Sequence, residues 1–395
     1  MLWYNILVLI HAYLFLLSGR FMESSADLVI VGAGAAGIGM GLMLQALGVD
    51  RFVILDRGDI GESFRRWPAE TSFITPSFYS NPFGLPDLNA VSPSSSPAIT
   101  SRTEHLNGQA YADYLALLAS KHELPVITQC SVEGVQRLPG DGFELTTSQG
   151  SGTTKLLIWA TGEFQFPDLL PFPGAQLCRH YAQVRSWKES ACSDQIVIGG
   201  YESGIDAAIN LIRMGCRVKL LVRKPNWDQP TPEDPSLSLS PFSRERMDKA
   251  MRSGRLELHF GADVTDVSKM MEWHRVRSSD GRVWLSENAP ILGTGFLSGG
   301  GARQIEECFD WAENGKPILT EHDESSKTPG LFMLGPQVQH EQRIYCFIYK
   351  FRQRFPVVAL KVLNRLGLPV PDNLDKTWAL FDPPAEGCCS DECDC

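Results

Sequence analysis

"VIVGAGAAGIG", residues 29–39, joins an apolar run to a glycine-rich turn and a helix-forming segment. A continuous apolar run is typical of a buried parallel strand. In a turn of this pattern, the first glycine permits the tight turn and the second admits a pyrophosphate close to the backbone. The third lets the helix pack on the strand. Gly32, Gly34 and Gly37 occupy these three places. The phosphates would lie at the positive end of the helix, so the stretch predicts a dinucleotide site.

A second unit of the same layout begins with "VIGGYESGID", residues 197–206. Gly32 and Gly48 are 16 positions apart, as are Gly199 and Gly215, and the second unit follows the first by 167 positions (199 − 32). Two units that agree in spacing are much stronger evidence than either glycine pattern alone. The sequence therefore predicts two nucleotide-binding βαβ units.

The second unit departs from the pattern at one position. Gly199 and Gly204 hold the first and third places, but Tyr201 takes the second. A ring there would push a pyrophosphate back or require a shifted turn, although Gly200 precedes it and the Ser203 hydroxyl could bind a phosphate. Two interpretations follow: a working nucleotide site with a variant turn, or a structural relic that has lost binding.

The residues that end the second strand of each unit indicate which nucleotide each would take. Asp56, followed by Arg57, suits an adenosine with a free 2′-hydroxyl, as in FAD or NAD. Arg223 and Lys224 suit a 2′-phosphate, which favours NADPH. We therefore expect FAD to be held by the first unit and NADPH to visit the second.

The predicted fold class is α/β: an FAD-binding, doubly wound (Rossmann-like) domain with an inserted, smaller NADPH-binding Rossmann-like domain. We expect residues 26–188 and 289–380 to form the first domain and residues 189–288 the second. Short alternating runs over 131–160 predict an antiparallel meander. The strand in "APILGTGF" (289–296) and the segment "GLFMLGP" (330–336) are expected to rejoin the first domain, and residues 340–355 are expected to form a helix.

The charge and the cysteine content argue against some functions. The net charge of −10 and the absence of a lysine-rich run argue against nucleic-acid binding. Six of the ten cysteines are scattered without a C-x-x-C pair, which is typical of reduced thiols in a cytoplasmic enzyme, and no metal site is predicted. The Cys-rich tail, residues 384–395, either binds soft metals or exchanges disulfides, or is an end without a role.

The first residues are strongly apolar. Residues 1–20 just reach the length that spans a bilayer, and Arg20 would place the enzyme body on the cytoplasmic side. Residues 1–22 are thus either an anchor or a mis-assigned start, with Met22 as the true first residue. The expected location is cytoplasmic, or anchored and facing the cytoplasm, with membrane contact only through residues 1–20.

Together these motifs resemble the flavoproteins with two dinucleotide-binding domains, and within them the flavin-containing, NADPH-using monooxygenases. The resemblance covers nearly all of residues 27–360: "GESFRRWP" (61–68) is similar to the segment that passes the flavin, and "WATGEFQFP" (159–167) and "ILGTGF" (291–296) to the two linker strands. It implies that the cofactor-binding residues are Gly32, Ala33, Gly34, Ala36, Gly37, Asp56, Arg57, Ser63, Trp67, Gly162, Gly199, Gly200, Ser203, Gly204, Arg223, Lys224, Gly295 and Gly335.

One residue is implied to act beside the flavin. "YSNP" contains Asn81, which resembles the asparagine that these monooxygenases place there; the alternative is an asparagine that only stabilises the loop before Pro82. Asn81 is the one catalytic residue we predict.

The chain also departs from the family pattern. In the fingerprint F-x-G-x-x-x-H, which would begin at Phe172, Cys178 stands in the histidine place and His180 comes two residues late. Pro336 follows Gly335 where disulfide reductases of this fold carry an acid. Thiol reduction is disfavoured because a dithiol relay needs a cysteine pair over the flavin, unless the Cys-rich tail serves as a mobile relay.

The function that follows is an FAD-dependent oxidoreductase in which NADPH reduces the flavin. The resemblance implies monooxygenation of a small organic substrate with O2 through a flavin C4a-(hydro)peroxide. Two alternatives stay open: an NAD(P)H–flavin oxidase or reductase, including a thiol/disulfide type, and an FAD-binding redox sensor without turnover. The sequence names neither the substrate nor the oligomeric state.

Overall fold

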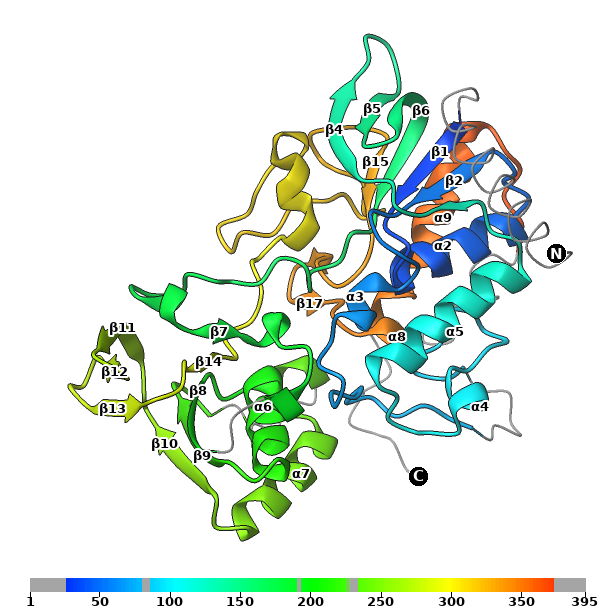
Figure 1. Cartoon of the computed structure of the whole chain (residues 1–395). Helices are drawn as coiled ribbons and strands as arrows, with labels where there is room; N and C mark the ends of the chain where they lie inside the picture. The colour runs from blue at the N-terminus through cyan, green and yellow to red at the C-terminus, as the bar shows by residue number, and fades with distance from the viewer. Residues whose placement is uncertain (1–25, 80–85, 190–192, 226, 228–233, 373–395) are drawn as a thin grey trace, which may run out of the picture.

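The computed structural model describes residues 26–79, 86–189, 193–225, 227 and 234–372. These residues form two lobes, each built on its own sheet (Figure 1). The first lobe combines the beginning and the end of the described chain, and the second contains its middle. This arrangement is the one expected when one dinucleotide-binding unit is inserted into another, and it confirms the predicted fold class.

The first lobe contains a seven-stranded sheet in the order β3-β2-β1-β6-β5-β4, with β15 also paired to β6. Its strands β1, β2, β3, β6 and β15 run parallel, whereas β4, β5 and β6 form the predicted antiparallel meander. The strand bounds are β1 Ala26–Val31, β2 Phe52–Leu55, β3 Val126–Ile127, β4 Val132–Arg137, β5 Phe143–Thr147, β6 Gly150–Trp159 and β15 Leu331–Met333.

Helices from both ends of the chain cover one face of this sheet. α2 (Ala35–Ala46) lies beside α9 (Arg354–Leu366), and α5 (Gly108–Lys121) packs into the same core (Figure 1). Close approach of α2 and α9 requires a glycine, because a Cβ on Gly39 would lie 2.4 Å from the Phe355 ring. Shorter helices complete the lobe: α3 Glu62–Arg65, α4 Ala98–Ser101, α8 Ile348–Phe351 and the 3₁₀ segment η5 Gly300–Cys308.

The second lobe contains a five-stranded parallel sheet in the order β10-β9-β8-β14-β7. Two helices cover one face and a three-stranded antiparallel sheet covers the other. The bounds are β7 Arg179–His180, β8 Asp194–Ile198, α6 Glu202–Arg213, β9 Arg217–Val222, α7 Pro241–Arg252, β10 Leu256–Phe260, β11 Val264–Met270, β12 Trp273–Ser278, β13 Val283–Ser286 and β14 Ile291–Leu292.

Two expectations about the later chain are wrong. The strand of "APILGTGF" does not rejoin the first lobe, because β14 pairs in parallel with β8 and β7 of the second sheet. Residues 340–355 do not form one helix: β16 (Gln339–His340) and β17 (Arg343–Ile344) make a hairpin, and α8 and the start of α9 follow. "GLFMLGP" does return, as β15 on β6.

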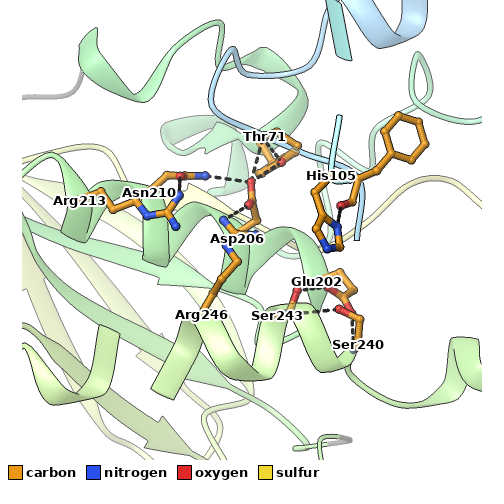
Figure 2. Close-up of polar contacts among 11 residues, drawn as sticks. Thr71, His105, Glu202, Asp206, Asn210, Arg213, Ser240, Ser243 and Arg246 are labelled. Carbon is orange, nitrogen blue, oxygen red and sulfur yellow. Dashed lines mark hydrogen bonds and ion pairs between the residues drawn. The ribbon is translucent and has the colours of Figure 1, made fainter. Parts of the chain in front are cut away.

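A buried carboxylate joins the lobes. Asp206 on α6 accepts hydrogen bonds from Thr71 of the first lobe (2.8 Å), from the Tyr181 hydroxyl (2.8 Å) and from Asn210 (3.1 Å). Arg246 on α7 donates to its other oxygen at 2.7 Å (Figure 2). Both side chains of the Asp206–Arg246 ion pair are under 10% exposed, at 8% and 6%. The pair therefore fixes α6 and α7 against the segment that carries Thr71.

Replacing Arg246 with Met should destabilise the protein, because Asp206 would keep a buried charge without its cation. The expected loss in the free energy of unfolding is about 3–5 kcal/mol, measured by urea denaturation. Arg217→Met is the matched control, since the 2.8 Å Arg217–Asp194 pair is exposed and should be worth about 0–1 kcal/mol. Equal losses in the two variants would contradict a structural role for the buried pair.

Candidate functional site

The first glycine turn follows β1 and has the geometry that a dinucleotide requires. Gly32 has φ 110° and donates its N–H to the Leu55 carbonyl at 2.7 Å, and a Cβ there would lie 2.4 Å from the Ala160 carbonyl oxygen. A Cβ on Gly37 would lie 1.8 Å from the Gly32 oxygen, so helix and strand touch. Gly34 differs, because a Cβ there would meet nothing within 4 Å and the residue borders a cavity. The turn is therefore open where a phosphate would approach.

Asp56, at the end of β2, stabilises this turn through hydrogen bonds. One carboxylate oxygen accepts the Ala33 N–H at 2.6 Å and the other accepts the Gly58 N–H at 2.8 Å. Burial raises the pKa of Asp56, and the two backbone hydrogen bonds partly offset that rise. Asp56 also borders the cavity, at the place where the sequence predicts a ribose.

A cavity of about 400 Å³ extends from the first turn to the start of α6 in the second lobe. Its walls include nine of the predicted cofactor-binding residues: Gly32, Gly34, Ala36, Asp56, Arg57, Ser63, Trp67, Gly162 and Ser203. Nine others are not part of its lining: Ala33, Gly37, Gly199, Gly200, Gly204, Arg223, Lys224, Gly295 and Gly335. Asn81 lies outside the described residues.

The cavity also contains residues that the sequence analysis did not single out. Aromatic side chains form much of the wall: Phe73, Phe164, Phe296, Phe347 and Phe351. Polar groups missed from the sequence include Thr71, Tyr181 and Glu163. Glu163 follows Gly162 directly in the linker motif, and this adjacency is the one sequence signal that could have identified it.

The second turn repeats the backbone geometry of the first. Gly199 has φ 114°, and a Cβ there would lie 2.4 Å from the Gly293 carbonyl oxygen. A Cβ on Gly204 would lie 1.8 Å from the Gly199 oxygen, as for Gly37 and Gly32. The Tyr201 side chain has therefore left the packing of turn, strand and helix unchanged.

Tyr201 and its neighbours hold the loop before α7. The Tyr201 hydroxyl lies 2.6 Å from the Ser236 carbonyl oxygen and 2.8 Å from that of Ser238, and burial raises the pKa of Tyr201 to about 12, so it stays a donor. The Trp227 indole donates to the Gly200 carbonyl at 2.8 Å. Tyr201 thus acts as an anchor for this loop.

Glu202, the first residue of α6, holds the same loop. Its carboxylate accepts the Ser240 N–H at 2.7 Å and the Ser243 hydroxyl at 2.5 Å (Figure 2). Burial raises the pKa of Glu202, and these hydrogen bonds oppose the rise. A carboxylate therefore lies at the positive end of α6, where a phosphate of the second nucleotide would bind.

The loop is also tied to the first lobe. Lys350 on α8 donates to both oxygens of Asp234 at 2.8 Å, and both side chains are largely buried. Burial alone would raise the pKa of Asp234, but hydrogen bonds from Lys350 and Ser236 outweigh it and lower the pKa. Nucleotide turn, loop and first lobe therefore form one connected set of contacts.

Three predicted glycines have positive φ, and two predicted cations lie at the surface. Gly162, Gly295 and Gly335 have φ of 66°, 94° and 109°, where glycine is favoured. Arg223 and Lys224 are exposed just beyond β9. The Nδ1 atom of His180 accepts the Ala182 N–H at 3.1 Å and its Nε2 donates to the Gly295 carbonyl at 2.9 Å, so His180 has a structural role.

Cys130 and Cys346 are not joined in a disulfide, and both border the cavity. Burial raises the pKa of both, and it raises the pKa of Cys178, in the fingerprint's histidine place, to about 12. In the part of the chain that the structure describes, no set of three or more His, Cys, Asp or Glu side chains could hold a metal ion. No helix within the described ranges is long and apolar enough to cross a membrane. Residues 1–20 and the Cys-rich tail lie outside these ranges.

Comparisons with known proteins identify the class. The family model described as pyridine nucleotide-disulphide oxidoreductase matches residues 29–335. Bacilliredoxin reductase Bdr of Bacillus subtilis is 24% identical over 241 residues, which are 61% of this chain and 68% of that protein. Other curated relatives are covered over about half of their length.

Solved structures agree on the fold. Bacillithiol disulfide reductase Bdr from Staphylococcus aureus has a TM-score of 0.71 at 18% identity, covering 87% of this chain and 99% of that one. A flavin monooxygenase mutant from Stenotrophomonas maltophilia has a TM-score of 0.68 at 18% identity, with the same coverage.

Both lobes and both turns define a two-nucleotide flavoprotein oxidoreductase. The chain belongs to the pyridine nucleotide-disulphide oxidoreductase family. This membership confirms the predicted class, an oxidoreductase that depends on FAD and NADP(H). The family's neighbours include monooxygenases and disulfide reductases, so membership alone does not select one reaction.

Two glycines of the first turn should respond differently to the same substitution. Gly34→Ala should fold normally, because its Cβ meets nothing, but should lose flavin, because the methyl group takes the place of a phosphate. Gly37→Ala should fail to fold stably, since its Cβ would overlap the Gly32 carbonyl. Thermal unfolding of flavin-free protein and flavin absorbance per chain would separate the two effects. Normal flavin content in Gly34→Ala would contradict this assignment of the turn.

Removing the charge of Glu202 should tighten nucleotide binding at the second turn. Glu202→Gln can keep a hydrogen bond to the loop while removing the negative charge at the start of α6, so Kd for NADP⁺ should fall roughly two- to fivefold. In the wild type, affinity should rise as pH falls through the raised pKa of Glu202, because the protonated carboxyl no longer repels phosphate. The variant should lack this pH dependence, as calorimetric titration would show. An unchanged Kd across pH would place the phosphates elsewhere.

Proposed function

We propose that the first turn holds FAD, that the second holds NADPH, and that the enzyme uses both to oxygenate a small organic substrate with O2. The observation that carries the proposal is the single cavity bordered by Gly34 of the first turn and Ser203 of the second. A hydride can pass directly only between groups that share such a space. We also propose that the enzyme works in the cytoplasm.

The residues present fit these two nucleotides. Gly32, Gly34 and Gly37 would receive the FAD pyrophosphate, with Asp56 at the ribose and Trp67 at the wall. Bound FAD would supply the two-electron chemistry that hydride transfer from NADPH requires. Ser203 would bind a phosphate of NADPH, and the exposed Arg223 and Lys224 would receive its 2′-phosphate.

The cavity walls favour oxygenation. Aromatic side chains, including Phe164, Phe296 and Phe347, give the space between the turns an apolar wall. Such a wall would help to exclude water once substrate and cofactors are bound, which protects reactive oxygen chemistry from hydrolysis. These walls belong to both the linker segments and α8, so the two lobes together make the space.

Disulfide reduction is the second candidate, because Cys130 and Cys346 border the same cavity and Bdr is a relative. A thiol attacks a disulfide as its thiolate, and burial raises the pKa of both cysteines. Both thiols therefore stay protonated at neutral pH, which makes this candidate weaker than oxygenation.

Anaerobic and aerobic turnover would separate the candidates. In full-length protein we expect NADPH to bleach the flavin without oxygen, and NADH to do so more slowly because it lacks the 2′-phosphate. With oxygen and a panel of amines, sulfides and ketones, one substrate should couple NADPH use to product with little hydrogen peroxide. NADPH use that releases only peroxide would favour an oxidase. Turnover that requires a disulfide and yields thiols would favour the reductase, and no bleaching would reject the proposal.

A further inference from the structure

The cavity contains five acidic side chains, and four of them already use both carboxylate oxygens or pair with a cation. Asp56 accepts two backbone N–H groups and Glu202 accepts two donors of the loop before α7. Glu62 pairs with Arg66 at 2.7 Å, and Asp206 pairs with Arg246. These four acids have structural roles, which leaves Glu163.

Glu163 stands at the point where the chain leaves the first sheet. Its Oε2 accepts a hydrogen bond from Gln337 Nε2. The Gln337 amide has one orientation here, because Gly299 N–H (2.9 Å) and Lys316 Nζ (2.5 Å) both donate to its Oε1. For Glu163 Oε1, the described residues provide no hydrogen-bond partner, and the residue borders the cavity. One oxygen is thus held in place while the other is free to meet a ligand.

The surroundings of Glu163 favour a carboxyl that exchanges protons. Burial raises its pKa, while Lys316 and the Gln337 hydrogen bond oppose that rise. Burial also lowers the pKa of Lys316. Cys346 is the third titratable group in electrostatic range, and its own pKa is raised mainly by burial. An acid whose pKa is moved toward neutrality suits general acid–base catalysis.

We propose that Glu163 is a catalytic residue, the acid that supplies the proton consumed in turnover. The inference rests on the proposed function, whose balance is substrate + O2 + NADPH + H⁺ giving oxygenated substrate, H2O and NADP⁺. One oxygen atom enters the substrate, and the other is reduced to water by the two electrons of NADPH. In the balance, its two hydrogens are the H⁺ and the hydrogen that leaves NADPH as hydride. The Glu163 carboxyl releases the H⁺ from Oε1 and regains it from water between turnovers.

The aromatic wall explains why an internal donor is needed. Phe164, the residue after Glu163, contacts Phe296, with ring centroids 5.5 Å apart, and both border the cavity. A wall that keeps water out while the substrate is oxidised also keeps solvent protons out. A carboxyl that borders the cavity, as Glu163 does, can supply the proton without an open path to solvent.

Glu163→Gln is the first test, because the amide can still accept from Gln337 but cannot release a proton. We expect kcat to fall about 100-fold or more at unchanged folding and flavin content. In the wild type, kcat should fall as pH rises through the pKa of Glu163, since the active form is protonated. The variant should lose this limb of the pH profile, a change that a purely structural role would not produce.

Lys316→Met is the second test. Lys316 lowers the pKa of Glu163, so removing this cation should raise that pKa and move the limb to higher pH. Infrared difference spectra between low and high pH, recorded without NADPH, should contain a carboxylic C=O band that shifts in Lys316→Met and disappears in Glu163→Gln. Glu144→Gln, exposed on β5, is the control and should change neither readout.

The outcomes separate the two proposals. If NADPH fails to reduce the flavin of the wild type, the proposed function fails whatever Glu163 does. If the wild type turns over and Glu163→Gln keeps its rate and pH profile, Glu163 is not the acid while the proposed function stands. An infrared band that survives Glu163→Gln would equally overturn the assignment.

Discussion

The buried carboxylate of Asp206 is the interaction on which the rest of the site depends. It receives donors from α6, α7 and the segment of Thr71, and so connects the two lobes through one charge. A buried charge is tolerated only with such complete pairing. Thr71, Tyr181 and Asp206 also border the cavity, so the contact that joins the lobes shapes the space between them.

The sequence predicts those parts of the fold that depend on contacts within or beside one motif. The two turns could be predicted because their glycines touch backbone a few residues away or on the neighbouring strand, and only glycine fits there. Residues 340–355 could not be predicted, because their structure depends on distant partners: Arg354 pairs with the fully buried Asp323, which also contacts His340. Glu163 was missed for the same reason, since its partner Gln337 is 174 positions away.

Tyr201 is a departure from the motif that the sequence reveals but does not explain. The sequence indicates correctly that a ring in the second glycine place is unusual. It cannot indicate that the hydroxyl reaches carbonyl oxygens 35 and 37 positions later, or that Glu202 holds the following serines. The substitution at the turn and the loop before α7 therefore belong together, and neither can be interpreted alone.

The contact between Lys350 and Asp234 has a consequence for how the two lobes move relative to each other. It joins the lobes at α8, while Thr71 and Asp206 join them at α6, so the two contacts lie on separate elements. A hinge rotation whose axis passes through neither contact strains both contacts at once. Such an opening is expected to be cooperative, with a closed and an open arrangement and few intermediates, rather than a gradual loosening of the interface.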